Sequence, residues 1–153
     1  MRTFMTAALL LSLAATHVLA PIPAFAQDSA KVILDRHERT IKAGDLAGVM
    51  ADYADNAVLV APAGIVAGEK NIAGTNVFEG KANIRKFFQV LTTRELPAVK
   101  TMVATYEFKT NDTALMHWAQ YKGTPKEVSG TDIWVIRGGK IITQVVLVNP
   151  PKK

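Results

Sequence analysis

The sequence predicts an α+β domain in which helices come first and an antiparallel sheet follows. Two segments, 29–43 and 81–93, carry apolar residues three and four positions apart, the spacing that gives a helix one buried face. From Val99 onward, runs of β-favouring residues are separated by turn sequences. Helices followed by a continuous series of hairpins are typical of α+β domains.

The first 26 residues have the organisation of a secretory signal peptide. A basic start at Arg2 precedes an apolar run over 4–20, and two prolines then lead to Ala24-Phe25-Ala26. A membrane span needs roughly twenty apolar residues, and this run is shorter and contains His17. We expect cleavage after Ala26, no stable membrane insertion afterwards, and a periplasmic or secreted location.

Residues 27–153 are expected to form a single domain, because a chain of this length supports one core but not two. There is no cysteine, which excludes disulfides, thiol nucleophiles and thiolate metal sites. The net charge is +5, but the basic residues are scattered and form no stripe with interleaved aromatic residues. Nucleic acid is therefore not an expected partner. A solvated basic surface is the simpler interpretation, and weak attraction to anionic lipid or acidic solutes is the alternative.

The first predicted helix, over 29–43, has one buried face. Gly44 ends it, because glycine tolerates the left-handed conformation at helix C-termini, and Asp45 caps the helix that follows. The residues expected to point inward are one histidine and its apolar neighbours: Ala30, Ile33, Leu34, His37 and Ile41.

A second short helix and a first strand are predicted next. The helix covers Leu46–Tyr53 and is closed by the turn residues Asp55 and Asn56, and the apolar run Ala57–Val60 is a buried strand. Residues 61–76 form a long connection with several glycines. This connection is either a lid or an ordinary surface insertion.

The second half is predicted to contain one helix and four strands. The turn at Val77–Gly80 leads into the helix Lys81–Thr93, which Pro97 stops. The strands form a meander of hairpins and cover Val99–Lys109, Thr113–Lys122, Val128–Arg137 and Lys140–Val148.

Four short segments occur in an order that matches a known superfamily. They are the Ala43-Gly44-Asp45 break, YADNAVLV, FEGKANIRKFF and the hairpin DIWVIRGGKI. Together they resemble the NTF2-like superfamily and its SnoaL-like domains over nearly all of residues 27–153. The resemblance implies a cone, with N-terminal helices packed on a curved, mainly antiparallel sheet around a pocket. It says little about activity, because the superfamily includes isomerases, dehydratases, cyclases and binding modules.

Strand parity selects the side chains expected in that pocket. The family register of the last hairpin places Asp132 and Trp134 inside, and pairing with the preceding strand then places His117 and Tyr121 inside. The candidate residues are a proton-transfer group of His37, His117 and Asp132, surrounded by the ligand-binding residues Tyr53, Tyr121, Trp134 and Gln144.

A buried carboxylate and a buried imidazole stabilise one another when they are hydrogen-bonded. The Asp then fixes the tautomer of the His, and the other ring nitrogen is free to act as a general base or acid. Each histidine is also compatible with a hydrogen-bonded core role. The histidines lack the close spacing of a zinc site, so no metal is expected, and no cofactor is expected either.

The similarity to ketosteroid isomerases does not extend to their catalytic base. Those enzymes carry an Asp before a proline at the end of the first strand, where this chain has Ala61 before Pro62. His37 occupies the position of their helix-one Tyr, and Asp132 that of their oxyanion Asp. Steroid isomerisation by that mechanism is therefore not expected. Scytalone dehydratase is similar in site composition, with a His pair and an Asp, and polyketide cyclases are similar in fold.

Two functions remain open. The first is an exported binding protein that holds a small apolar or aromatic molecule in its cone without changing it. The second is a cofactor-independent lyase or isomerase in which His117 or His37 moves a proton while Asp132 orients it.

The outer face of the sheet is predicted to form a homodimer interface. It is expected to carry apolar side chains that would be unfavourable in water: Met116, Trp118, Ile133, Val135, Val145 and Leu147.

Overall fold

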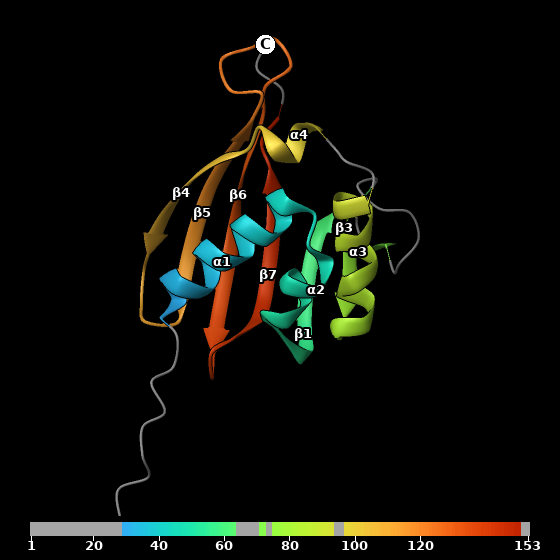
Figure 1. The fold of residues 1–153 in the computed structure, drawn as a ribbon, viewed down its shortest axis with the longest axis vertical. Helices are drawn as coiled ribbons and strands as arrows, with labels where there is room; N and C mark the ends of the chain where they lie inside the picture. The colour runs from blue at the N-terminus through green and yellow to red at the C-terminus, as the bar shows by residue number, and fades with distance from the viewer. Residues whose placement is uncertain (1–28, 64–70, 73–74, 94–96, 151–153) are drawn as a thin grey trace, which may run out of the picture.

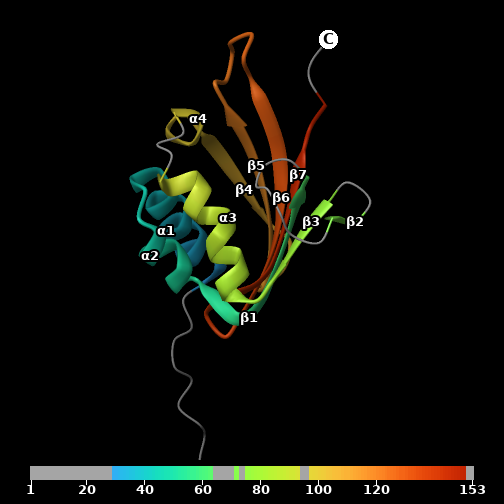
Figure 2. The ribbon, with the colours of Figure 1, turned by 90° about the vertical axis from the view of Figure 1, so that its right-hand side faces the viewer.

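The computed structural model describes residues 29–63, 71–72, 75–93 and 97–150. The predicted signal peptide and part of the predicted connection over 61–76 lie outside the described residues. No helix among the described residues is long and apolar enough to cross a membrane. The elements, labelled in Figure 1 except for β2, which Figure 2 labels, are α1 (Ala30–Ala43), α2 (Leu46–Ala51), β1 (Tyr53–Pro62), β2 (Asn71–Ile72), β3 (Thr75–Glu79), α3 (Lys81–Thr93), α4 (Pro97–Lys100), β4 (Val103–Phe108), β5 (Thr113–Gln120), β6 (Val128–Arg137) and β7 (Lys140–Val148).

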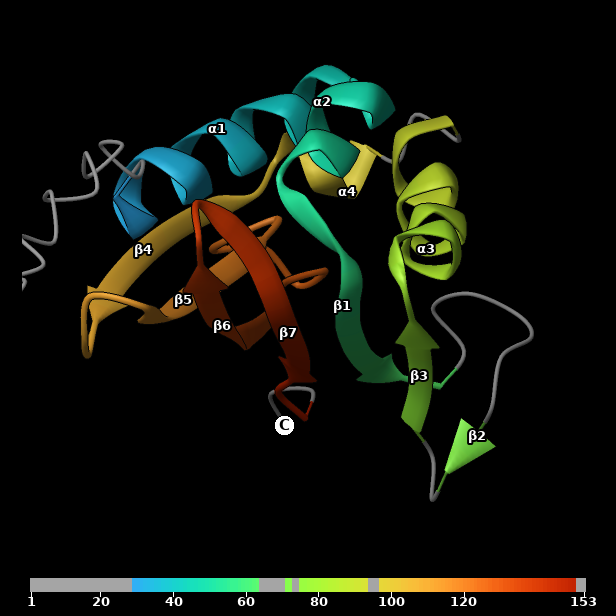
Figure 3. The same ribbon diagram turned by 90° about the horizontal axis from the view of Figure 1, so that it is seen from below.

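The described strands form one curved sheet in the order β2-β3-β1-β7-β6-β5-β4. All neighbouring pairs are antiparallel except β1 and β7, which run parallel. The helices lie on the concave side of this sheet (Figures 2 and 3). The predicted α+β class and the predicted packing of N-terminal helices on a curved sheet are confirmed.

The two helix ends around Gly44 follow the predicted capping chemistry. Gly44 has a φ of 69°, in the left-handed region, and its N–H donates to the Ile41 carbonyl. Asp45 accepts the Gly48 N–H on its Oδ1 at 2.9 Å. This tight junction turns the chain so that α1 and α2 pack together before β1 begins.

The prediction for the segment after α2 was wrong at its boundary. The helix ends at Ala51, and Tyr53, Asp55 and Asn56 all belong to β1. The pairing of β1 with β7 shifts register between Tyr53 and Val58. Asp55 and Asn56 lie within this irregular stretch and are exposed, which explains why turn-type residues are tolerated inside a strand.

Two further elements differ from the prediction. Thr75–Glu79, predicted as the end of a loop and a turn, forms β3 and pairs with β1. Pro97–Lys100 forms α4, so the strand predicted to start at Val99 starts at Val103. Proline is well suited to the first turn of a helix, and the inward-facing Val99 and Met102 are spaced three apart as on a helix.

The core lies between the helices and the concave face of the sheet. Both layers contribute fully buried side chains to it, including Ile33, Leu34, Val49, Leu59, Phe78, Ile84, Phe88 and Trp134. Burying one such side chain stabilises the fold by about 2 kcal/mol. This core fixes the helices to the sheet and frames a cavity beside it.

Candidate functional site

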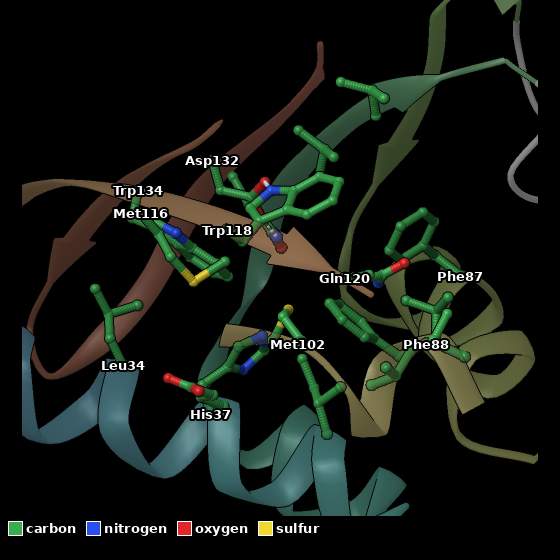
Figure 4. A pocket seen from close by; sticks show the side chains of 18 of the residues that line it. Leu34, His37, Phe87, Phe88, Met102, Met116, Trp118, Gln120, Asp132 and Trp134 are labelled. Carbon is green, nitrogen blue, oxygen red and sulfur yellow. Dashed lines mark hydrogen bonds between the residues drawn. The ribbon is translucent and has the colours of Figure 1, made fainter. Parts of the chain in front are cut away.

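A cavity of about 350 Å³ lies between α1, α3, α4 and strands β5–β7. Figure 4 shows it from close by, with side chains of α1 on one side and side chains of the sheet on the other. Most of its wall is apolar, and the main contributors are Leu34, Phe88, Met102, Met116, Trp118 and Trp134. The polar residues in the wall are His37, Glu38, Gln120, Asp132 and Gln144.

The cavity reaches the surface at the end of the sheet nearest α4. Val128 starts β6 and Val148 ends β7, and both line the cavity although they are 43% and 40% exposed. Ala98 and Met102 line it from α4 and the residues that follow. A ligand would therefore enter between α4 and this edge of the sheet.

A chain of hydrogen bonds crosses the sheet wall of the cavity. Asp132 is buried, and its carboxylate accepts the indole N–H of Trp118 at 2.8 Å and the amide of Gln144 at 2.7 Å. The carbonyl oxygen of Gln144 in turn accepts the hydroxyl of Tyr53. Burial raises the pKa of Asp132 to about 7, although the hydrogen bonds from Gln144 and Trp118 act in the opposite direction. Asp132 therefore exchanges a proton near neutral pH.

Glycine at position 130 makes the bond between Trp118 and Asp132 possible. Gly130 pairs with Trp118 across β5 and β6. A Cβ on Gly130 would lie 2.4 Å from Cζ2 of the indole and 2.2 Å from the Leu147 carbonyl oxygen. The missing side chain lets the indole lie across β6, where its N–H reaches the carboxylate of Asp132.

His37 enters the cavity from α1 (Figure 4). Its ring is 2% exposed and makes edge contacts with Tyr53, Phe88 and Trp134, at centroid distances of 5.5, 5.3 and 5.0 Å. Neither ring nitrogen has a hydrogen-bond partner among the described residues. Burial lowers the pKa of His37, so the imidazole is neutral at pH 7.

Behind His37 lies a partly buried ion pair that was not predicted from the sequence. Asp52 is fully buried, and its Oδ1 accepts from Arg36 Nε at 2.7 Å and Nη2 at 2.6 Å. Its Oδ2 lies 3.7 Å from His37 Nδ1, slightly beyond hydrogen-bond distance. Among the described residues, the carboxylate beside the His37 ring is thus that of Asp52 and not that of the predicted Asp132.

Glu38 is a second carboxylate in the cavity wall, and its oxygens are already engaged. One accepts the hydroxyl of Tyr106 at 2.8 Å, and the other pairs with Lys42 at 2.6 Å. His37 therefore differs from Glu38 and Asp132, which both have hydrogen-bond partners within the protein.

The predicted placement of His117 and Tyr121 in the cavity was wrong. The His117 side chain is half exposed on the outer sheet face, with Nδ1 at 3.0 Å from Thr131 Oγ1. Tyr121 lies in the turn after β5, with a φ of 50°, and its N–H donates to Thr101 Oγ1. Asp132 pairs with Met116, so Met116 and Trp118, predicted outside, line the cavity instead.

The error comes from the length of one turn. Val128 pairs with Gln120, which leaves residues 121–127 as the connection. The predicted position of His117 on the cavity face requires a turn that is one residue shorter or longer, because a shift of one residue reverses the face of every side chain in a strand. Testing both turn lengths would have identified Trp118. The Arg36–Asp52 pair, sixteen positions apart, has no local sequence pattern.

The other predicted site residues lie at or directly beside the cavity. Asp132, Trp134 and Gln144 line it together with His37. Tyr53 is buried behind Gln144 and contacts the His37 ring. The predicted hydrogen bond between a histidine and Asp132 is replaced by the bonds that Asp132 accepts from Trp118 and Gln144.

Comparison with known families assigns the fold. The sequence profile of the SnoaL-like domain matches residues 34–144. The chain belongs to the SnoaL-like family. The predicted relation to the NTF2-like superfamily is confirmed. A comparison with curated protein sequences found no match for this SnoaL-like chain.

Several solved structures are similar to this SnoaL-like protein. A protein from Sphaerobacter thermophilus has a TM-score of 0.60 and 16% identity, covering 80% of this chain and 97% of its own. An NTF2-like protein of unknown function from Burkholderia xenovorans has a TM-score of 0.56 and 16% identity, covering 80% and 84%. The epoxide hydrolase/cyclase-like enzyme SalBIII, with a role in pyran ring formation in the polyether salinomycin, has a TM-score of 0.56 and 18% identity, covering 78% and 89%. These similarities concern the fold.

Proposed function

We propose that this SnoaL-like protein binds a small apolar or aromatic molecule in its cavity and releases it unchanged. The observation that carries the proposal is a cavity of about 350 Å³ whose wall is mostly apolar but contains an imidazole that has no hydrogen-bond partner in the described part of the chain. Ligand pockets are typically roughly 300–1,000 Å³ and combine apolar walls with a few polar groups that orient the ligand. The size favours a molecule of two or three fused or linked rings.

The neutral fluorescent probe N-phenyl-naphthylamine tests this proposal. The chain has two tryptophans, Trp118 and Trp134, and both line the cavity, so a bound probe would receive energy from them. Val146→Phe should fill the cavity and weaken binding at least about tenfold, because Val146 lines it. Val145→Phe is the matched control, since Val145 points to the opposite face of β7. Equal binding by both variants would contradict the proposal.

The second candidate is a cofactor-independent lyase or isomerase. It is supported by Asp132, whose pKa of about 7 is suited to general acid–base catalysis near neutral pH, and by the ring nitrogens of His37, which no described residue hydrogen-bonds. The fold of SalBIII, a cyclase-like enzyme, adds an analogy at the level of architecture only.

Ring opening of nitrobenzisoxazole tests this second candidate. A base removes the ring C–H proton while the N–O bond breaks, and the coloured cyanonitrophenolate reports the rate. We expect His37→Gln and Asp132→Asn each to slow the reaction at least about tenfold, as for loss of a general base. The enzyme hypothesis fails if neither variant is slower than the wild type.

We also propose that the protein is exported and forms a homodimer through the outer sheet face. Export is supported by the signal-like sequence over 1–26, and mass spectrometry of secreted protein should find Gln27 as the N-terminus.

The dimer is supported by Ile133, Val135 and Val145, which remain on the outer face together with the half-exposed Leu147. The other predicted members of that interface, Met116 and Trp118, line the cavity instead.

A further inference from the structure

We infer that Asp52, held in place by Arg36, fixes the tautomer of His37 so that the cavity presents a hydrogen-bond acceptor, and that the ligand therefore carries a hydroxyl group. This inference rests on the proposed ligand-binding function. It narrows the ligand from any apolar molecule to an alcohol, phenol or enol with an apolar ring body. Asp52 is a positioning residue, because it would act on the ligand only through His37.

The first step concerns the charge of His37. The ring is 2% exposed and is surrounded by the aromatic rings of Tyr53, Phe88 and Trp134. In such surroundings an uncharged imidazole is favoured, because a buried cation would lose its hydration. A neutral imidazole has one N–H donor and one acceptor nitrogen, so the two tautomers present opposite groups to the cavity.

The second step selects the tautomer. Asp52 is ion-paired with Arg36 through Oδ1, and its Oδ2 has no hydrogen-bond partner among the described residues. This free oxygen lies 3.7 Å from His37 Nδ1. An ionised carboxylate only accepts hydrogen bonds. With the proton on Nδ1, an N–H faces the carboxylate, whereas the other tautomer would place two lone-pair-bearing atoms opposite one another.

The third step concerns the other ring nitrogen. With the proton on Nδ1, Nε2 is an acceptor, and it has no partner among the described residues. Nε2 is at the end of the ring farthest from the backbone of α1, and the side chain extends from α1 into the cavity (Figure 4). An unsatisfied buried acceptor is unfavourable, so a ligand that donates a hydrogen bond there is preferred. A hydroxyl donates this bond, and an ether or a simple ketone does not.

The tautomer can be measured without any ligand. In protein with ¹⁵N-labelled histidine, long-range ¹H–¹⁵N NMR distinguishes protonated from unprotonated ring nitrogens, and His37→Gln identifies the signals of His37. We expect the Nδ1–H form in the wild type, and a shift toward the Nε2–H form in Asp52→Asn, whose amide can donate to Nδ1. Asp35→Asn is the matched control, because Asp35 lies on the exposed side of the same helix and pairs with Lys31. An Nε2–H form in the wild type overturns the inference.

The ligand preference is tested with β-naphthol and its methyl ether, which share the ring body and differ in the donor. We expect the wild type to bind β-naphthol about tenfold more tightly than the ether, the effect of one hydrogen bond to a buried acceptor. Asp52→Asn should reduce this ratio to less than about threefold, while Asp35→Asn keeps it.

The outcomes separate the two proposals. Equal wild-type affinity for both probes overturns the hydroxyl inference and leaves the proposed binding function standing. Failure of the wild type to bind either probe contradicts the binding function and the inference that rests on it. Because the tautomer and the probe ratio are both read from the wild type, the test holds even if Asp52→Asn does not fold.

Discussion

Asp132→Asn should change how the stability of the protein depends on pH. The pKa of Asp132 is raised by burial from 3.8 to about 7. A group whose pKa is higher in the folded state than in the unfolded state stabilises the fold at pH values below its pKa in the unfolded state. This stabilisation is lost as the pH rises through its pKa in the folded state. Asn has no proton to lose, so the variant should not show this loss.

The size of the effect follows from the raised pKa of Asp132. A pKa shift of one unit corresponds to about 1.4 kcal/mol in the free energy of unfolding. Roughly two units of the rise in the pKa of Asp132 fall between pH 5 and pH 7. Between pH 5 and pH 8, the free energy of unfolding of the wild type should therefore fall by about 3 kcal/mol relative to that of Asp132→Asn.

Asn is a suitable replacement because the hydrogen-bond chain can adapt to it. Its Oδ1 can accept the Trp118 N–H as Asp132 does. If the Gln144 amide turns over, the Asn amide donates to the Gln144 oxygen, and the Gln144 amide then donates to the hydroxyl of Tyr53. Most contacts at Asp132 are thus preserved while its titration is removed.

Urea unfolding at a series of pH values, followed by tryptophan fluorescence, measures the difference. His37 titrates in part of the same range with the opposite sign, since its lowered pKa makes the fold less stable as the pH falls below 6.5. This contribution is common to both proteins and cancels in the difference between them. If the difference in unfolding free energy between the two proteins stays constant from pH 5 to pH 8, the pKa of Asp132 is not raised toward neutrality. The proposed acid–base role would then lose its basis.

Three further predictions concern the frame of the cavity and its outer face. Gly130→Ala should lower the free energy of unfolding by about 3 kcal/mol and change the fluorescence emission of Trp118, because the new Cβ meets the indole and a backbone oxygen. An unchanged urea midpoint and an unchanged emission would contradict this prediction. Leu59→Ala, at a fully buried position, should cost about 3 kcal/mol in urea unfolding, whereas Leu147→Ala, 48% exposed, should cost less than about 1 kcal/mol in the monomer. Ile133→Glu should convert the proposed dimer to a monomer in size-exclusion chromatography with light scattering, and a wild type that is already monomeric at micromolar concentration would refute the dimer.

Local sequence patterns predicted most of the fold. The apolar spacing of α1 and α3, the caps around Gly44 and the extents of β6 and β7 all agree with the structure. The errors lie where tertiary pairing decides the conformation. Asp55 and Asn56 favour a turn locally, yet they lie in β1, which pairs with β7 on both sides of them. The strand β3 depends in the same way on its pairing with β1, which its own five residues do not reveal.

The site was less predictable than the fold, for two physical reasons. Which face of β5 points inward depends on the number of residues in a surface turn. An error of one position therefore placed His117 in the predicted cavity, where the structure has Trp118. Which carboxylate lies beside His37 depends on the packing of α1 against α2, which brings Asp52 there from a distant position in the chain. His37, Asp132, Trp134 and Gln144 were predictable because each follows the parity or periodicity of a regular element.

The parallel pairing of β1 with β7 has a consequence for how the protein is made. The first strand of the sheet lies beside the last one, and Tyr53 on β1 shares a hydrogen bond with Gln144 on β7. During synthesis, β1 has no β7 partner until Lys140–Val148 has been translated. Contacts between such distant parts of the chain form slowly, because a long loop has to close first. The ligand cavity therefore arises late in folding, and a fragment that lacks the last strand would have neither the central pairing of the sheet nor a complete cavity wall.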